Sequence, residues 1–121
     1  MDEKDLQGRW HSRYEYGDGK IGEHEVNLLP QRNQGILGVS PEVEGESHLV
    51  LELEFQLPRK LAGSWRERTS RTGEYRGKVF EGFLMLILND DFTAAKGQWI
   101  GDNRDQTEVN SGTWTLEREV E

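Results

Sequence analysis

The sequence predicts an all-β fold, an antiparallel up-and-down β-barrel of about eight strands, from two observations. Apolar and polar residues alternate with a period of two along most of the chain, and helical periodicity is nearly absent. All four tryptophans stand in the frame Gly-x-Trp, in which the ring shares a strand face with a position that has no side chain. These tryptophans are Trp10, Trp65, Trp99 and Trp114. A two-sheet β-sandwich is the alternative that the pattern leaves open.

The first two strands are expected at Leu6–Tyr16 and Ile21–Leu29, and Pro30 ends the second. Even-numbered residues face the interior in both strands, because they carry most of the apolar and small side chains. The inward set of the first strand is Leu6, Gly8, Trp10, Ser12, Tyr14 and Tyr16, and that of the second is Gly22, His24, Val26 and Leu28.

The first hairpin allows two registers. A two-residue turn at Asp18-Gly19 would pair Trp10 with Asn27. Pairing Trp10 with Leu28 instead keeps the inner face consistent along both strands, so we favour that register and a longer loop.

A weak third strand is expected at residues 34–40, and a cleanly alternating fourth strand ends at Pro58. The inward residues of the fourth strand would be Leu49, Leu51, Leu53, Phe55 and Leu57. After the fifth strand and a polar turn, the chain is expected to return as a strand over residues 74–80. A register that pairs Trp65 with Gly77 would place Glu67 beside Tyr75 inside the barrel.

The next segment changes its alternation near Gly82, which is either a bulge, giving eight strands, or a break, giving nine. Residues 83–88 are apolar on both faces, which suggests that a partner subunit covers the outside there. We therefore expect a homo-oligomer through this run, and a charge at Leu86 should disrupt it. The last two strands carry Ala95, Gly97 and Trp99, then Asn110, Gly112, Trp114, Leu116 and Arg118.

The composition fits one small domain that spans residues 1–121. Only 33% of the residues are hydrophobic, so either the surface is very polar or the interior is partly polar or hollow. The charged start and the absence of a long apolar stretch predict neither a signal peptide nor a membrane span. The chain has no cysteine, and a cytoplasmic location is the default expectation.

The formal net charge of −8 argues against binding to nucleic-acid polymers, whose binding domains usually carry a positive excess. Residues 59–78 are nevertheless basic. This island is either the solvated outer face of one hairpin or a patch that attracts an anionic ligand or an acidic partner. The candidate anion-attracting residues are Arg66, Arg68, Arg76 and Lys78.

Two resemblances extend this interpretation. Gly8-Arg9-Trp10 and Arg118 resemble the calycin group of barrels, the lipocalin-like and avidin-like proteins. In that group the first strand opens with Gly-x-Trp and the last strand carries a basic residue over the tryptophan. The resemblance implies a lipocalin-like barrel closed by a cation–π contact between Arg118 and Trp10.

The second resemblance covers residues 61–118, with its repeated Gly-x-Trp motifs and the motif Gly-x-Tyr-x-Gly. This half is similar to an accessory β domain of bacterial proteins that are sometimes joined to DNA-binding or defence-related modules. It implies a sensing or accessory role in a bacterial regulatory or defence system.

The alternation of inward and outward residues places aromatic rings and a few polar groups near one mouth of the barrel. We expect a ligand site there, because such a lining suits a small, flat, polar ligand. The alternative is that the polar groups only satisfy one another across a water-filled lumen. The candidate ligand-binding residues are Tyr14, Tyr16, His24, Trp65, Glu67, Thr69, Tyr75, Trp99, Asn110 and Trp114.

Glu67 is the sharpest candidate, because a carboxylate on the tryptophan face of a strand is costly to bury unless it is paired. It would act in a structural ion pair, as an acceptor for the ligand, or as a general acid or base. No metal site is expected, since the three histidines are dispersed and cysteine is absent. No cofactor motif is present either.

Three functions remain at this point. The first is a non-enzymatic barrel that captures or senses a small polar aromatic ligand, for which a nucleotide-derived signal is one class, since a base stacks on aromatic rings and a phosphate suits the basic island. The second is a protein interaction or oligomerisation module that uses the apolar run at 83–88. The third is an enzyme that uses Glu67 as acid or base, and the absence of a catalytic motif weighs against it.

Overall fold

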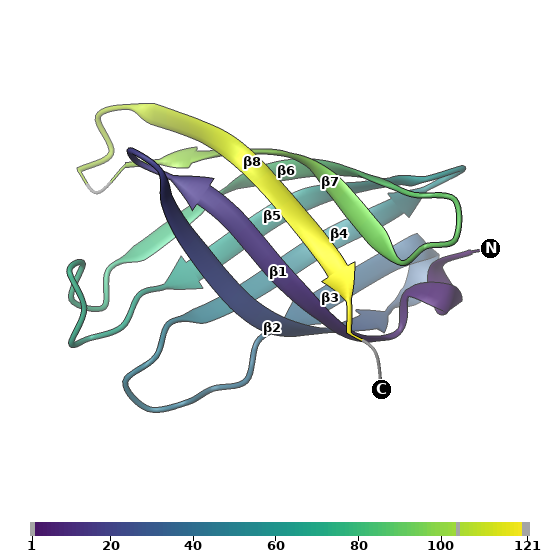
Figure 1. The fold of residues 1–121 in the computed structure, drawn as a ribbon, viewed down its shortest axis with the longest axis horizontal. Coiled ribbons are helices and arrows are strands. Elements are labelled where there is room, and N and C mark those ends of the chain that lie inside the picture. Colours follow the sequence, from purple (N-terminus) through teal and green to yellow (C-terminus); the bar gives the residue numbers. More distant parts are fainter. Residues whose placement is uncertain (1, 104, 120–121) are drawn as a thin grey trace.

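A computed structural model describes residues 2–103 and 105–119 and closes eight antiparallel strands into one barrel (Figure 1). Each strand pairs with the next, and the last pairs with the first. The up-and-down barrel of eight strands is therefore confirmed, and the sandwich and nine-strand alternatives are excluded. The strands are β1 (Gly8–Tyr16), β2 (Lys20–Pro30), β3 (Gly35–Val39), β4 (His48–Gln56), β5 (Lys60–Arg68), β6 (Val79–Leu88), β7 (Ala94–Asp102) and β8 (Val109–Arg118).

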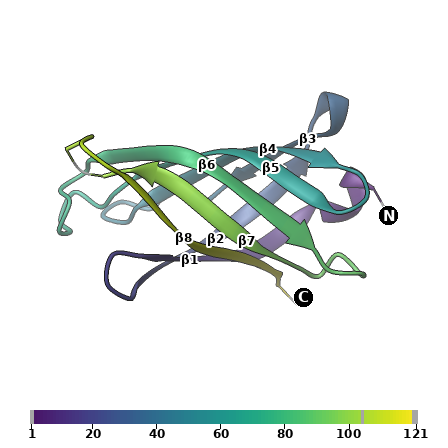
Figure 2. The ribbon, with the colours of Figure 1, turned by 90° about the horizontal axis from the view of Figure 1, so that it is seen from above.

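The strands cross the barrel obliquely, and the described chain begins and ends near the same end of it (Figures 1 and 2). Two short 3-10 helices, η1 (Glu3–Leu6) and η2 (Arg32–Gln34), lie outside the wall. Within the described residues, neither helix has the length and apolar character that a membrane crossing requires.

The predicted inward faces agree with the burial of the strands. Trp10, Ser12 and Tyr14 are buried on β1, and the odd-numbered residues from Leu49 to Phe55 are buried on β4. Two residues at the expected strand ends differ. Leu6 belongs to η1, and Leu57 lies beyond β4 and is 68% exposed, because β4 ends at Gln56.

A packed plug fills the end of the barrel that carries η1. Leu6 is fully buried there, and its carbonyl accepts a hydrogen bond of 2.9 Å from the Trp10 indole N–H. Phe92, from the turn between β6 and β7, packs edge-on against Phe55 at a centroid distance of 5.7 Å. This half of the barrel is therefore solid, like the interior of other small domains.

Arg118 holds η1 against the barrel. Its guanidinium carbon lies 4.7 Å from the centroid of the Trp10 ring, and it donates hydrogen bonds to the carbonyls of Gln7 and Asp5. Gly8 makes room for this contact, because its φ is +137° and a Cβ there would lie 3.3 Å from the guanidinium. Residues that are 108 positions or more apart in the sequence are thus joined at this end.

Four loops surround the opposite end, which is open. Their described residues are 17–19, 40–47, 69–78, 103 and 105–108, at the left of Figure 1. The loop before β4 is fixed by the buried Ser40, whose Oγ accepts a 2.8 Å hydrogen bond from the Leu49 N–H. Ser70 joins two of the loops, since its hydroxyl donates to the Gly45 carbonyl at 2.5 Å.

The first hairpin has neither of the expected registers. Tyr16 pairs with Lys20 across the three-residue turn 17–19, and Trp10 pairs with Val26 rather than with Leu28. A shift of two residues leaves every side chain on the same face, so the inward set is unchanged. Gly17 and Gly19 permit the turn, with φ of +54° and +82°.

The register between β5 and β6 also corrects the prediction. Trp65 lies opposite Gly82, not Gly77, and Glu67 lies opposite Phe80 rather than Tyr75. Residues 69–78 form a loop, since β6 begins only at Val79. The Gly82 position is a regular member of the strand, where a Cβ would come within 1.8 Å of the Ile100 carbonyl oxygen.

The apolar run of β6 divides between the two faces of the wall. Leu84, Leu86 and Leu88 point inward and are buried, whereas Phe83 and Met85 point outward. The expectation that Leu86 lies on an outer contact surface is therefore wrong, because its even number places it in the core.

Candidate functional site

The open half of the barrel holds a cavity of about 450 Å³. Its walls are the open-end portions of β1, β5, β6, β7 and β8, and the loops before β4, β6 and β8 contribute the rim. The lining residues are Tyr14, Tyr16, Ser47, Trp65, Glu67, Thr69, Ser70, Gly73, Glu74, Tyr75, Phe80, Trp99, Asp102, Asn103 and Asn110.

Aromatic rings form the floor of the cavity. Trp65 and Trp99 stand perpendicular to each other, with centroids 5.6 Å apart. Trp114 lies behind them, 1% exposed, and stacks against Tyr14 at 4.6 Å. Offset and edge-to-face contacts of this kind fix ring positions, so the floor is pre-formed.

The indole N–H groups of this floor are all engaged within the protein. Trp65 donates to the Ile100 carbonyl at 3.1 Å, and Trp99 donates to the Glu15 carbonyl at 2.9 Å. Trp114 donates to the Ser12 hydroxyl at 2.9 Å. The two tryptophans that line the cavity therefore offer their ring surfaces to a ligand and not their N–H donors.

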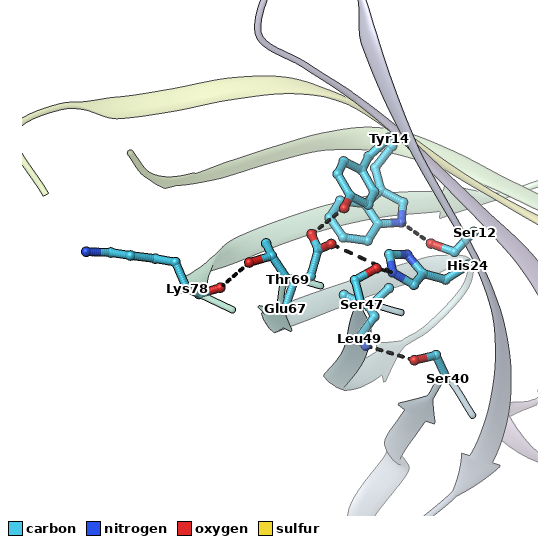
Figure 3. Close-up of polar contacts among 10 residues, drawn as sticks. Ser12, Tyr14, His24, Ser40, Ser47, Leu49, Glu67, Thr69 and Lys78 are labelled. Atoms are coloured by element: carbon cyan, nitrogen blue, oxygen red, sulfur yellow. Dashed lines mark hydrogen bonds and ion pairs between the residues drawn. The ribbon is translucent and has the colours of Figure 1, made fainter. Parts of the chain in front are cut away.

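Glu67 is the central polar residue of the cavity wall (Figure 3). Its Oε1 accepts a hydrogen bond from the Tyr14 hydroxyl, and its Oε2 lies 3.7 Å from His24 Nε2. The same histidine nitrogen is 2.7 Å from the Ser47 hydroxyl oxygen. The side chains of His24 and Glu67 are 7% and 13% exposed, so strands β1, β2 and β5 and one loop meet here around a nearly buried carboxylate.

Burial shifts the acid–base equilibria of this cluster. It raises the pKa of Glu67, although hydrogen bonds from Tyr14 and Ser47 act in the opposite direction. Burial, assisted by the neighbouring His48, lowers the pKa of His24 from 6.5 to about 4. The pKa of Tyr14 is raised by its burial and by Glu67. His24 is thus neutral at pH 7, and its contact with Glu67 is not an ion pair at that pH.

The structure brings most of the predicted site residues to one cavity. Two of them stand apart from its surface: His24 lies behind Glu67, and Trp114 lies beneath Tyr14. Tyr75 lines the cavity from the 69–78 loop and not from the expected strand. The predicted residues on the lining are Tyr14, Tyr16, Trp65, Glu67, Thr69, Tyr75, Trp99 and Asn110.

Several lining residues escaped the sequence analysis. Phe80 would have followed from the correct register of β6, since it is the residue opposite Glu67. Ser47, Glu74 and Asn103 stand in loops, where no periodic pattern shows which way a side chain points.

The basic side chains of residues 59–78 do not line the cavity. The four candidate anion-attracting residues are among them, and Arg66 lies on the outer wall, 3.0 Å from Glu81. Arg59 lies at the packed end, where it pairs with Asp90 at 2.5 Å. The described residues contain no group of three side chains suited to hold a metal ion.

Comparisons with solved structures place this chain among small β-barrels. The redesigned beta barrel b11L5F_LGL is 15% identical, with a TM-score of 0.64 over 98% of this chain and 95% of the other. EF1p2_mFAP2b bound to DFHBI is 12% identical, with a TM-score of 0.69 over 96% and 95%. The redesigned beta barrel mFAP1, also bound to DFHBI, is 13% identical, with a TM-score of 0.63 over 96% and 97%.

These likenesses show the fold. No family model matches the sequence, and no curated protein matches it either.

Proposed function

We propose that this protein is a non-enzymatic barrel that captures a small, flat, polar ligand in the cavity at its open end. The observation that carries the proposal is the cavity of about 450 Å³ with aromatic rings around the nearly buried Glu67 carboxylate. Concave, mostly apolar sites with a few placed polar groups are the usual form of small-molecule sites.

The division of the barrel supports this function. Leu6, Trp10 and Phe55 are fully buried in one half of the barrel, whereas Trp65 and Trp99 line the cavity in the other half. Their contact with each other and their hydrogen bonds to the wall hold the rings in place without a ligand. A pre-formed site of this kind loses little conformational entropy when it binds.

Two barrels of the same fold are bound to DFHBI, a small aromatic dye. They support the proposal by showing that a barrel of this size and topology can carry an aromatic small molecule. A nucleotide-derived signal is one ligand class to test, because its base would stack on Trp65 or Trp99. Its phosphate would need a basic partner beyond the described lining, which contains no lysine or arginine.

Native mass spectrometry of freshly purified protein, compared with the denatured mass, tests the proposal. We expect additional mass on the native protein that is lost on denaturation and reduced in a Trp65→Ala variant. Trp65→Phe is the matched control, because it keeps an aromatic surface at the floor. Absence of retained mass, together with no binding of aromatic fragments by ligand-observed NMR, would contradict the proposed function.

An outer surface favours a second candidate, an interaction or oligomerisation module. Phe83, Met85 and Ile87 of β6 are 50–63% exposed on one face, and Ile100 of β7, which lies opposite Phe83, is 48% exposed. Contiguous exposed apolar side chains commonly mark protein contacts. A second copy of this chain is the partner that we propose for it.

A further inference from the structure

The charged groups on the cavity lining are all acidic. Glu67, Glu74 and Asp102 contribute carboxylates, and no lysine or arginine among the described residues lines the cavity. Lys20 neutralises Glu74, with Nζ 3.1 Å from a carboxylate oxygen. Glu67 has no such partner, because within the described residues only the neutral His24 lies within ion-pair distance of it.

The hydrogen-bond donors of the lining are largely used inside the protein. Besides the two indoles, the Tyr14 hydroxyl donates to Glu67 and the Thr69 hydroxyl donates to the Lys78 carbonyl at 2.9 Å. The Ser70 hydroxyl donates to the Gly45 carbonyl. What the wall presents is therefore rich in acceptors, and its complement is a ligand that donates hydrogen bonds.

The aromatic surfaces favour the same kind of ligand. Six aromatic side chains line the cavity: Tyr14, Tyr16, Trp65, Tyr75, Phe80 and Trp99. The face of an aromatic ring carries negative electrostatic potential, and it attracts cations most strongly where water is excluded. Trp65, whose indole N–H is committed to the Ile100 carbonyl, lines the same cavity as the Glu67 carboxylate.

The loops around the mouth of the cavity also carry a net negative charge. The described residues of the four loops at the open end, 17–19, 40–47, 69–78, 103 and 105–108, include seven acidic and three basic residues. The whole chain has a net charge of −8. An acidic entrance raises the local concentration of cations and their rate of association.

We propose that the cavity selects an organic cation, an aromatic compound with a protonated amine, and that Glu67 is its counter-ion. This inference rests on the proposed function and narrows it to one chemical class. The ammonium group would lie between the Glu67 carboxylate and the aromatic faces, while the aromatic part stacks on the tryptophan floor. The ligand thereby replaces the cation that the wall lacks.

Three probes with one ring system test the inference: tryptamine, which is a cation, tryptophol, which is neutral, and indole-3-acetate, which is an anion. Isothermal titration calorimetry on the unmodified protein should give tryptamine an affinity at least tenfold higher than that of tryptophol. Indole-3-acetate should bind more weakly than both. Tryptophol or indole-3-acetate binding as tightly as tryptamine would overturn the inference.

Two variants locate the counter-ion. Glu67→Gln keeps the size of the side chain and should lower the affinity for tryptamine at least tenfold while that for tryptophol stays within twofold. Glu52→Gln removes the same charge from the outer face of β4 and should leave both affinities within twofold. Equal losses for tryptamine in the two variants would assign the effect to net charge and overturn the role of Glu67. The ranking on the unmodified protein stands even if a variant fails to fold.

The outcomes separate this inference from the proposed function. If the neutral or anionic probe binds as tightly as tryptamine, the preference for cations is rejected and the proposed small-molecule function is retained. No binding of any probe, together with no retained mass on the native protein, removes both.

Discussion

Trp99 on β7 lies opposite Gly112 on β8, and a Cβ on Gly112 would lie 2.7 Å from the Trp99 indole nitrogen. The relationship is reciprocal, because Trp114 of β8 lies opposite Gly97 of β7. Gly112 thus accommodates the Trp99 ring, whereas a Cβ on Gly97 or Gly63 would meet the backbone of the neighbouring strand. The repeated motif is a packing device for the wall, and the ligand site uses the rings that it positions.

This relationship predicts the effect of Gly112→Ala. The added methyl group would meet both the Trp99 ring and the Glu15 carbonyl oxygen, so the wall must shift. We expect a loss of about 1–3 kcal/mol in the free energy of unfolding, as for other overpacked interiors. Urea denaturation followed by tryptophan fluorescence measures it. Gly73→Ala is the control, since its Cβ would have ordinary contacts at 3.5 Å; similar losses in the two variants would contradict the packing argument.

Arg118→Met tests whether the Arg118 side chain holds η1 against the packed end of the barrel. Methionine keeps part of the stem but loses the cation–π contact with Trp10 and the hydrogen bonds to Gln7 and Asp5. We expect the free energy of unfolding to fall by about 1–3 kcal/mol. Arg13→Met, which removes an exposed arginine 3.9 Å from Glu23, should change it by less than about 1 kcal/mol. An unchanged stability in Arg118→Met would show that η1 packs without these contacts.

The lowered pKa of His24 predicts acid sensitivity. Its folded-state pKa is about 4 and its ordinary value is 6.5, so the unfolded chain binds the proton first. The stability contribution is complete above pH 6.5 and is lost as the pH falls through 4. It amounts to about 3 kcal/mol. Unfolding free energies measured between pH 4 and 7 should therefore depend less on pH in His24→Gln, whereas the exposed His11→Gln should retain the wild-type slope. Equal slopes in all three proteins would refute the assignment.

The contribution of Glu67 to stability has the opposite pH dependence to that of His24. Because burial raises its folded-state pKa, its stability contribution is present below its ordinary value of 4.5 and is lost as the pH rises through the folded-state pKa. Glu67→Gln removes the cost of a buried charge, so at pH 8 the variant should be as stable as the wild-type protein or more stable. Thermal unfolding at pH 8 measures this. A marked decrease in the variant's stability would instead identify Glu67 as a structural carboxylate.

The outer surface of β6 predicts self-association. Met85→Glu places a charge in the centre of the exposed set between Phe83 and Ile87, and should shift a dimer to monomer in sedimentation velocity. Glu54→Gln, on the outer face of β4, serves as the control and should leave the oligomeric state unchanged. A wild-type protein that is monomeric at high concentration would exclude this second candidate.

The sequence predicted which residues face the inside of the barrel. It did not predict which residues lie opposite each other on neighbouring strands, nor where the loop residues lie. Period-two alternation identified the strands, and it placed Tyr14 and Glu67 on the inner face. Trp10 opposite Leu28 and Trp10 opposite Val26 give the same inner face, so apolar pattern alone cannot choose between them. The length of the turn decides, and that depends on the backbone of its glycines.

Loop residues were beyond reach for a related reason. Ser47 joins the Glu67 cluster from a segment without periodic structure, and its place depends on how Ser40 and Ser70 hold the loops. Tyr75 was expected beside Glu67 in a strand and lines the cavity from a loop instead. The positions of such loop residues follow from tertiary structure and leave no local pattern in the sequence.

The separation of a solid half from a hollow half gives this barrel a modular character. The residues that hold the packed end together include Trp10, Phe55 and Arg118, and none of these three lines the cavity. Distant sites of this kind respond to substitution almost independently. The open end could therefore be rewritten, by mutation in nature or by engineering in the laboratory, to accept new molecules while the same closed base keeps the chain folded.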